Sequence, residues 1–499
     1  MSKSESKSSR KKGVAGPTYR IPPGSPWANA WKVAGVLGGV GLAASLFGWS
    51  ADPHRFAYSW LFAFMAVLAL GLGSLFFVLG QHLTGAGWGV SLRRTAEFLL
   101  SGLPIMAILF VPIWMNRETL YPWIAHQREA AAHEAEHDAG EAGEHGGDAA
   151  HEEHGGAEGS DEHGSWLSPG GLFADDGRAS AQEPVPPQDL HPNERELGEE
   201  HAAGHDHHSP DHELHEVTLG QKTWWLTDTK FSIRVLIYFA LWIGLVILYV
   251  WSSRRQDKEK GLAITKRLET LAPLSTFVFG LTLTGAAIDW TMSMEPTWYS
   301  TIFGVQYFAT SAVIAHATII LITMGLYRAG LLQNAISVEH FHDMGKLLHG
   351  FIVFWAYISF SQFMLIWYAG IPEESTYYHL RWWGGGGFLN LSGLLVIAGF
   401  ILPFLMLMSR NAKRNLTMLT FSAGWIVVMH IVQCYWLYMP YAEQTGLVET
   451  SLRLHWLDAA CLFGVAGTYL AFVFWNMTQH PLIPVGDPRL KRALHHEVA

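Results

Sequence analysis

Long apolar runs separated by short polar segments make up most of the chain. About ten of these runs reach the roughly 18 to 25 residues that an α-helix needs to cross about 30 Å of hydrocarbon. The pattern therefore predicts an all-α polytopic membrane protein. Its transmembrane helices are expected near residues 30–49, 57–80, 95–115, 232–251, 272–290, 302–326, 347–369, 386–408, 417–439 and 456–476.

The composition agrees with this fold class. Of 499 residues, 49% are hydrophobic and 22 are Trp, which is more apolar than a soluble protein of this size. The two cysteines, Cys434 and Cys461, both fall inside predicted spans. The sequence contains neither a CxxCH haem-attachment motif nor an iron–sulfur cysteine cluster. The chain is therefore expected to bind no haem or iron–sulfur cluster of its own.

The distribution of Lys and Arg predicts the orientation, because cationic loops stay on the cytoplasmic side of a membrane. Both termini are expected in the cytoplasm, with residues 1–29 and 477–499 as tails, and residues 289–301 on the opposite side. The N-terminal tail lacks the apolar core and cleavage site of a signal peptide. Basic residues gather in alternate connections: SRKK near the N-terminus, Arg93 and Arg94, the stretch from Arg254, residues 327–346, the stretch from Ser409, and the C-terminal RLKR.

An insert, residues 116–231, separates the first three spans (30–115) from the last seven (232–476). It is acidic and holds many of the 26 His of the chain. Because it has few large apolar residues, it is expected to be extracytoplasmic and largely disordered. Imidazole and carboxylate groups together can bind Zn²⁺ or Cu²⁺, but the His residues follow no fixed ligand spacing. We interpret the insert as a solvated tether whose acidity suits a basic partner such as a cytochrome.

Ionisable side chains inside the spans are candidates for function, because burying them in hydrocarbon is costly unless they are paired or hydrated. Glu97 lies near the cytoplasmic end of the third span, either as a proton-uptake group or in an ion pair with Arg93 or Arg94. His316 and His430 lie near the middle of the sixth and ninth spans. A single buried His is more often a hydrogen-bonded core residue than a metal or haem ligand.

The seventh span carries a series of polar side chains. They are Lys346, His349, Tyr357, Ser361 and Gln362, with Ser359 beside them. Such groups at roughly helical repeats can hold a chain of waters for a proton relay. The alternative is interhelical hydrogen bonding that fixes the packing. The two interpretations are compatible.

On the outer side, carboxylates lie near the span ends. Asp289 ends the fifth span and Asp458 begins the tenth, where the helix dipole also stabilises a carboxylate. The outer loops contribute Glu295 and Glu373. Aromatic residues in the same loops, including Trp290, Trp298 and Tyr299, are expected at the lipid headgroup level or against a docked subunit.

Two long segments resemble a known family. DWTMSMEPTWYSTIFGVQYF (289–308) and GKLLHGFIVFWAYISFSQFMLIWYAGIPEE (345–374) resemble the ActF subunits of alternative complex III, within the NrfD and PsrC group of membrane subunits. The resemblance covers most of the membrane part but not the His-rich insert. It implies ten helices arranged as two four-helix bundles plus two further helices, in the cytoplasmic membrane of a bacterial cell.

The resemblance also implies a function and partners. The complex is a quinol:cytochrome c oxidoreductase, in which this subunit would pack beside an ActC-like homologue, a multihaem cytochrome c subunit and an iron–sulfur subunit. Menaquinol or ubiquinol would be the reductant, and the haems and clusters would belong to the partners. The chain itself is expected to have no redox centre, and to act as a scaffold or to conduct protons.

Three mechanistic hypotheses follow. In the first, protons pass through an inner half made of Glu97, Lys346, His349 and His316, and then through an outer half made of Tyr357, Ser361, Gln362, His430, Asp289 and Asp458. In the second, the chain binds quinol, with His349 or Asp289 accepting the proton at the end of an apolar cleft. In the third, the chain is a metal or ion transporter, which requires charged pairs deep in two or more spans.

Overall fold

The computed structural model describes residues 19–129, 132, 220, 222–382, 387–443, 452 and 454–496. Within these residues every regular element is a helix, and ten helical segments are long and apolar enough to cross a membrane. Each of them coincides with a predicted span. The sequence-based prediction of an all-α polytopic membrane protein is therefore confirmed.

Six of the ten spans are single helices: α2 (Pro53–Leu83), α11 (Leu262–Trp290), α12 (Phe303–Arg328), α13 (Val338–Ala369), α18 (Leu416–Glu443) and α19 (Trp456–Gln479). The first is α1 (Ala30–Ala51), extended by the 3₁₀ turn Pro26–Asn29. The third is divided into α3 (Val90–Leu100), α4 (Leu103–Leu109) and α5 (Val111–Met115).

The remaining two spans contain π-helical turns. The fourth consists of α9 (Asp228–Val246), the π-helix η3 (Ile247–Trp251) and α10 (Ser252–Glu259). The eighth consists of α15 (Phe388–Leu394), the π-helix η5 (Leu395–Ile401) and α16 (Leu402–Met406). The shorter elements are α6 (Arg117–Leu120), the 3₁₀ turn η4 (Met292–Met294), α14 (Pro372–Trp382), α17 (Arg410–Arg414) and α20 (Leu490–Leu494).

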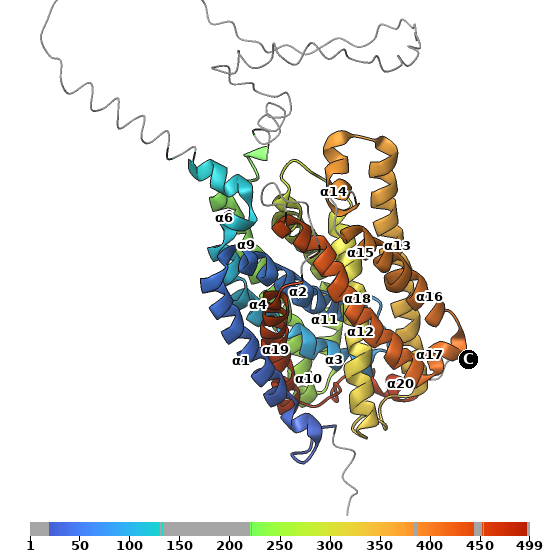
Figure 1. Ribbon diagram of the computed structural model, residues 1–499. Coiled ribbons are helices and arrows are strands. Elements are labelled where there is room, and N and C mark those ends of the chain that lie inside the picture. The colour runs from blue at the N-terminus through green and yellow to red at the C-terminus, as the bar shows by residue number, and fades with distance from the viewer. Residues whose placement is uncertain are drawn as a thin grey trace, which may run out of the picture. The chain divides into compact units, whose positions relative to one another are not determined.

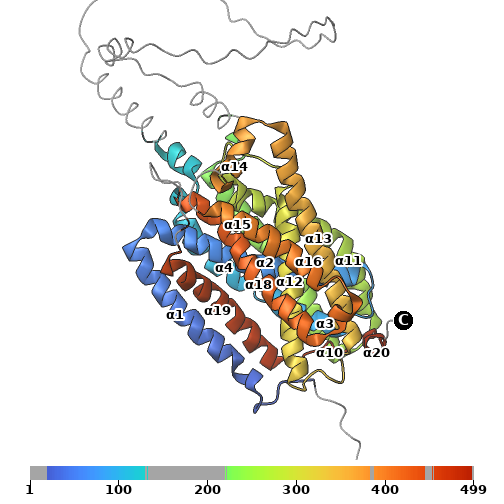
Figure 2. The ribbon, with the colours of Figure 1, turned by 45° about the vertical axis from the view of Figure 1, so that its right-hand side comes forward.

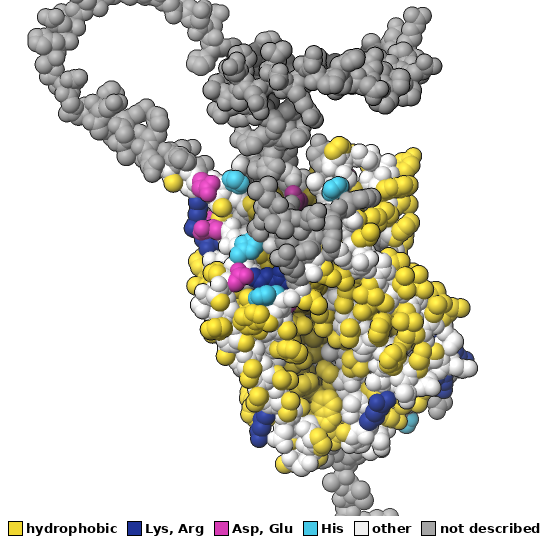
Figure 3. All heavy atoms as spheres, in the orientation of Figure 1, with side chains coloured by type: hydrophobic (Ala, Val, Ile, Leu, Met, Phe, Trp, Pro, Cys, Tyr) yellow, Lys and Arg dark blue, Asp and Glu magenta, His cyan; other side chains and the backbone are white. Residues whose placement is uncertain are grey.

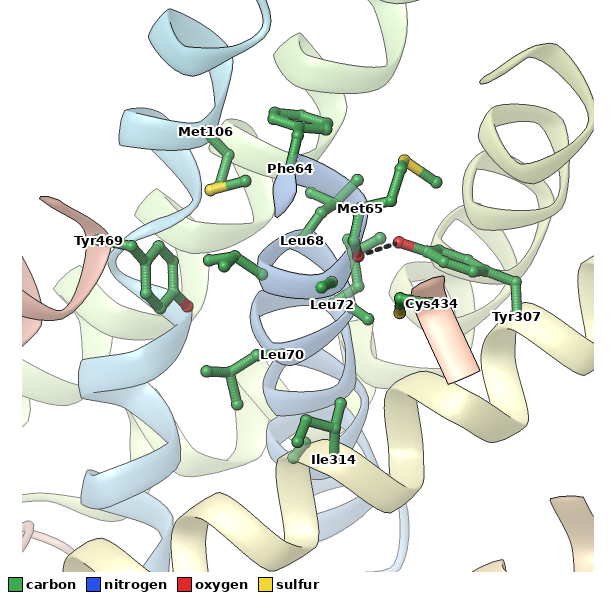
Figure 4. Packing of buried hydrophobic residues seen from close by; sticks show 14 of the residues in the cluster. Phe64, Met65, Leu68, Leu70, Leu72, Met106, Tyr307, Ile314, Cys434 and Tyr469 are labelled. Atoms are coloured by element: carbon green, nitrogen blue, oxygen red, sulfur yellow. Dashed lines mark hydrogen bonds between the residues drawn. The ribbon is translucent and has the colours of Figure 1, made fainter. Parts of the chain in front are cut away.

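The helix α2 lies at the centre of the packing. It contacts α3 and α11 on one side, and α12, α18 and α19 on others. Figure 4 shows its apolar side chains pointing outward in several directions, with the Tyr307 hydroxyl of α12 donating a hydrogen bond to the Met65 carbonyl at 3.1 Å. A helix that is buried on all faces is expected to be apolar all round, as this one is.

The other spans group around this centre. The second to fifth spans contact one another, as do the sixth to ninth. The first and tenth, α1 and α19, form a separate pair that lies side by side in Figure 2. Gly41 and Gly464 allow the close approach of this pair, because a Cβ on Gly41 would lie 2.3 Å from the Gly464 nitrogen.

The start of the described chain lies against the segment that follows α19. The Leu482 amide donates to the Tyr19 carbonyl at 2.7 Å, and Figure 1 places α10, α17 and α20 toward the same end of the helices. We call this end the chain-end face. The visible face in Figure 3 is largely apolar across the middle, with charged side chains toward both ends, as expected for a protein surrounded by lipid.

The predicted insert is described only at its two ends. Residues 116–129 contain α6 and a further helical segment, and α9 begins at Asp228, before the predicted boundary at residue 232. The predicted disorder and tether role of the insert concern residues that otherwise lie outside the described part of the chain.

Candidate functional site

Asp289, at the end of α11, is completely buried. Arg234 of α9 binds both of its oxygens, through Nε at 2.7 Å and Nη2 at 2.9 Å. The Tyr238 hydroxyl and the Trp225 indole N–H also donate to it, at 2.7 and 2.9 Å. Four donor atoms therefore hold this carboxylate in one orientation, and two of them form a bidentate arginine pair.

Asp458 forms a second clamp, between α2 and α19. Its oxygens accept hydrogen bonds from Arg55 Nη2 and Ser59 Oγ, both at 2.6 Å. It also accepts the His455 backbone N–H at 3.0 Å, which completes a capping box at the start of α19. Asp458 thus lies in the first turn of α19, as expected, and its arginine partner adds a link between two helices that are far apart in sequence.

Glu97 belongs to a third and larger cluster, near the chain-end face. It is 1% exposed and pairs with Arg93 at 2.9 Å and Arg94 at 3.2 Å, as the helical spacing predicts. Arg93 also contacts Asp487, and Arg94 contacts Asp257 of α10. This network ties α3 and α10 to the C-terminal segment that follows α19.

Asp487 is the member of this network that lies beyond the membrane spans. Burial by itself raises the pKa of its carboxyl, but the charge of Arg93 and the charge and hydrogen bonds of Arg489 outweigh burial and lower the pKa from 3.8 to about 2. A carboxylate with a lowered pKa in the folded state stabilises the fold above its unfolded pKa. That contribution is lost as the pH falls from about 4 to about 2.

We therefore expect Asp487→Asn to loosen the C-terminal segment at pH 7. Backbone hydrogen exchange in residues 482–493 should be faster in the variant than in the wild type, because the charges of Arg93 and Arg489 lose a partner. The difference should shrink as the pH falls from about 4 toward 2, where the wild-type carboxylate itself becomes protonated. Equal exchange at pH 7 would contradict the assignment.

His316 and His430 have separate surroundings. The His316 ring lies against Phe77 and Phe351 and bonds the Ala312 carbonyl at 2.7 Å. His430 bonds the Ala66 carbonyl at 3.0 Å. Residues 66 and 77 of α2 differ in level by about 16 Å along the helix axis. The two imidazoles therefore do not bridge the halves of the predicted proton path.

The polar residues of α13 divide between two faces. Lys346 is half exposed and pairs with Asp343 at 2.6 Å, and Tyr357, eleven residues on, is 63% exposed. Gln362 is 2% exposed, because five further residues turn the helix by about 140° beyond a full turn. The polar residues of this span, expected at roughly helical repeats, therefore do not all lie on one face of the helix.

The inward groups of α13 bond to neighbouring elements. Gln362 accepts the Ser300 hydroxyl at 3.3 Å, and Ser359 accepts the Gln306 amide of α12 at 3.5 Å. His349 stacks on Phe404 of the eighth span, with ring centroids 5.0 Å apart. Ser361 is partly buried. These contacts agree with the packing interpretation of the span.

The outer-loop aromatics differ in their environments. Trp298 is 1% exposed, stacks on Tyr377 at 4.2 Å and donates to the Glu374 carbonyl, whereas Tyr299 is 53% exposed. Trp290 is completely buried. Trp290 and Trp298 therefore pack inside the protein and do not face lipid, whereas their level in a membrane stays a prediction. Glu295 lies in the turn after η4, and the side chain of Glu373 lies outside the described ones.

No protein-family model matches the sequence, and no curated protein is significantly similar to it.

Sequence reasoning found the carboxylates but missed the arginines that hold them. Arg234 lies within the predicted span 232–251, so its position in an apolar run was a usable signal. Arg55 precedes its predicted span by two residues. Arg381 of α14 was also missed. It is completely buried among the rings of Tyr377, Trp436 and Tyr441.

The described residues were also compared with the ligand sets that metal ions need. Among these residues, no group of three or more His, Cys, Asp or Glu side chains is close enough to hold a metal ion. Cys434 and Cys461 are free thiols in the interior. Most of the His-rich insert lies outside the described residues, so the hypothesis of metal capture by the insert stays a prediction.

Proposed function

We propose that the chain is a scaffolding subunit of a quinol:electron-acceptor oxidoreductase of the alternative complex III kind, in the cytoplasmic membrane of a bacterial cell. The two segments at residues 289–308 and 345–374 support this assignment by their resemblance to the ActF subunits. The arrangement of helices also agrees with the two bundles and additional pair described for that family.

The observation that most favours a scaffold over a proton conductor is that the buried carboxylates are paired with arginines. Asp289, Asp458 and Glu97 each form an ion pair with at least one arginine. The pairs of Asp289 and Asp458 connect α11 to α9 and α19 to α2, and Glu97 belongs to the network that ties α3 to α10 and the C-terminal segment. These contacts support a packing role for the three carboxylates.

The hypothesis that the chain binds quinol, with His349 or Asp289 accepting its proton, has less support. It requires an apolar cleft that reaches His349 or Asp289. An apolar cleft beside α13 is lined by other residues, among them Gln306, Trp355 and Trp436. Asp289 already accepts four hydrogen bonds from protein groups.

The test is affinity purification of the tagged chain from gently solubilised native membranes, followed by mass spectrometry and a haem spectrum. We expect a multihaem cytochrome, a large iron–sulfur protein and a second ten-span homologue to co-purify. An unrelated tagged membrane protein from the same membranes serves as the control. A haem-free chain that purifies alone and binds zinc would contradict the proposal and favour the transporter hypothesis.

A further inference from the structure

An apolar cleft lies among the sixth to ninth spans. It is bounded by α12, α13, α14, η5 and α18 and has a volume of about 500 Å³, which falls in the range of roughly 300 to 1,000 Å³ typical of small-molecule sites. Much of its wall is aromatic, contributed by Trp355, Phe363, Tyr378, Trp382, Phe400 and Trp436. None of the ten residues of the predicted proton path lines this cleft. Ser359, which lies beside them on α13, does.

The mouth of the cleft faces the lipid-exposed side of the spans. Phe360 of α13 and Val396 and Ile401 of η5 line it and are 60%, 58% and 43% exposed. All three belong to membrane-spanning segments. A ligand would therefore enter from hydrocarbon, which selects for a lipid-soluble molecule.

Two polar atoms at the cleft are buried without a hydrogen-bond partner. They are the Gln306 Oε1 acceptor and the Trp355 Nε1 donor. The amide of Gln306 is oriented by its contact with Ser359 Oγ. Buried polar groups in proteins are nearly always paired, so an orphaned donor and an orphaned acceptor beside one cleft call for a partner.

Two further polar side chains of the cleft are already paired. Gln433 donates to Thr310 at 3.0 Å, and Ser392 accepts the Trp436 indole N–H at 2.7 Å. Gln306 Oε1 and Trp355 Nε1 have no such protein partner. An acceptor and a donor can both be satisfied by a ligand group that donates one hydrogen bond and accepts another, and a hydroxyl does both.

The absence of charged side chains from the described cleft lining indicates which head group the cleft can bind. None of the described residues that line the cleft is Lys, Arg, Asp or Glu. The nearby Arg381 lies behind Trp436 and donates to the Leu437 carbonyl at 2.8 Å. An ionised head group in this cleft would be desolvated without a counter-charge, which is strongly unfavourable. The lining thus selects an uncharged head.

The π-helix η5 gives independent support. Its seven residues, Leu395–Ile401, supply part of the cleft wall. π-Helical turns interrupt the regular bonding of an α-helix and are found frequently at functional sites.

We propose that this cleft binds an uncharged lipid whose head carries a hydroxyl group. The hydroxyl donates to Gln306 Oε1 and accepts from Trp355 Nε1, while the hydrocarbon part lies among the aromatic side chains and extends through the mouth between α13 and η5. A neutral glycerolipid and a quinol share this chemistry. The inference stands on the cleft alone and does not depend on membership of an oxidoreductase complex.

The test uses the full chain purified in detergent, with binding of added lipids measured by native mass spectrometry. The neutral probes are dioleoylglycerol and the reduced form of decylubiquinone, and the charged comparison is dioleoylphosphatidylglycerol. At least one neutral probe should bind. Trp355→Phe, which removes only the indole N–H, should weaken its affinity about tenfold, the equivalent of one hydrogen bond.

Two further variants control for indirect effects. Trp475→Phe, on α19 and outside the cleft lining, should bind like the wild type. Ala356→Leu, which narrows the cleft, should abolish binding. Preference for decylubiquinol or for dioleoylglycerol would distinguish a ring head from a glycerol head. The proposal is overturned if neither neutral probe binds, if the charged lipid binds equally well, or if Trp355→Phe and Trp475→Phe behave alike.

Discussion

Asp289→Asn is expected to lower the free energy of unfolding by about 3 to 5 kcal/mol, the usual cost of removing one partner of a buried ion pair. The substitution leaves the shape of the side chain almost unchanged but removes its charge. Arg234 is then left with little access to water, since its side chain is only 12% exposed. Unfolding of the detergent-solubilised protein, followed by circular dichroism, measures the loss.

The double variant Asp289→Asn/Arg234→Gln is the matched control. It removes both charges and should be more stable than the Asp289→Asn single variant, because no unpaired charge stays buried. If Asp289→Asn unfolds like the wild type, the carboxylate is not a structural anchor, and a titrating role for it regains support.

Gly73→Ala is expected to destabilise the protein by at least about 2 kcal/mol, toward the upper part of the range for overpacked cores. A Cβ at this position of α2 would lie 1.8 Å from the Ser311 carbonyl oxygen and 2.5 Å from its carbon, both in the backbone of α12. Backbone atoms cannot rotate away as a side chain does. The two central helices would have to separate.

Gly80→Ala, seven residues along the same helix, is the control. A Cβ at Gly80 would meet nothing within 4 Å, so the gain in helix propensity of up to about 1 kcal/mol should dominate. Both variants are compared with the wild type in the same unfolding experiment. Equal stabilities of the two alanine variants would show that α2 and α12 do not pack as closely as described.

The helices could be predicted from the sequence because a single local property, an apolar run of membrane-spanning length, decides them. The ends of the spans were located less well, because the helices continue into polar residues: α11 begins at Leu262 and α13 at Val338, ten and nine residues before the predicted starts. Sequence reasoning also predicted the pairing of Glu97 with Arg93 and Arg94, since partners three and four residues apart on one helix are fixed by local geometry.

Contacts between distant segments could not be obtained in this way. The partners of Asp289 and Asp458 come from helices 55 and 403 residues away, and only the packing of the helices brings them together. The burial of Trp298 has the same cause, because it depends on α14 folding back over the turn after η4. The cleft among the sixth to ninth spans has no local sequence signature either.

The central claim of this account is that the buried carboxylates hold helices together and do not carry protons. The most direct test is the number of protons released per electron transferred by the oxidoreductase complex proposed above, compared between wild type and the Asp289→Asn/Arg234→Gln variant. We predict that the assembled variant complex releases as many protons per electron as the wild type. A variant complex that assembles and transfers electrons normally but releases fewer protons would contradict the claim.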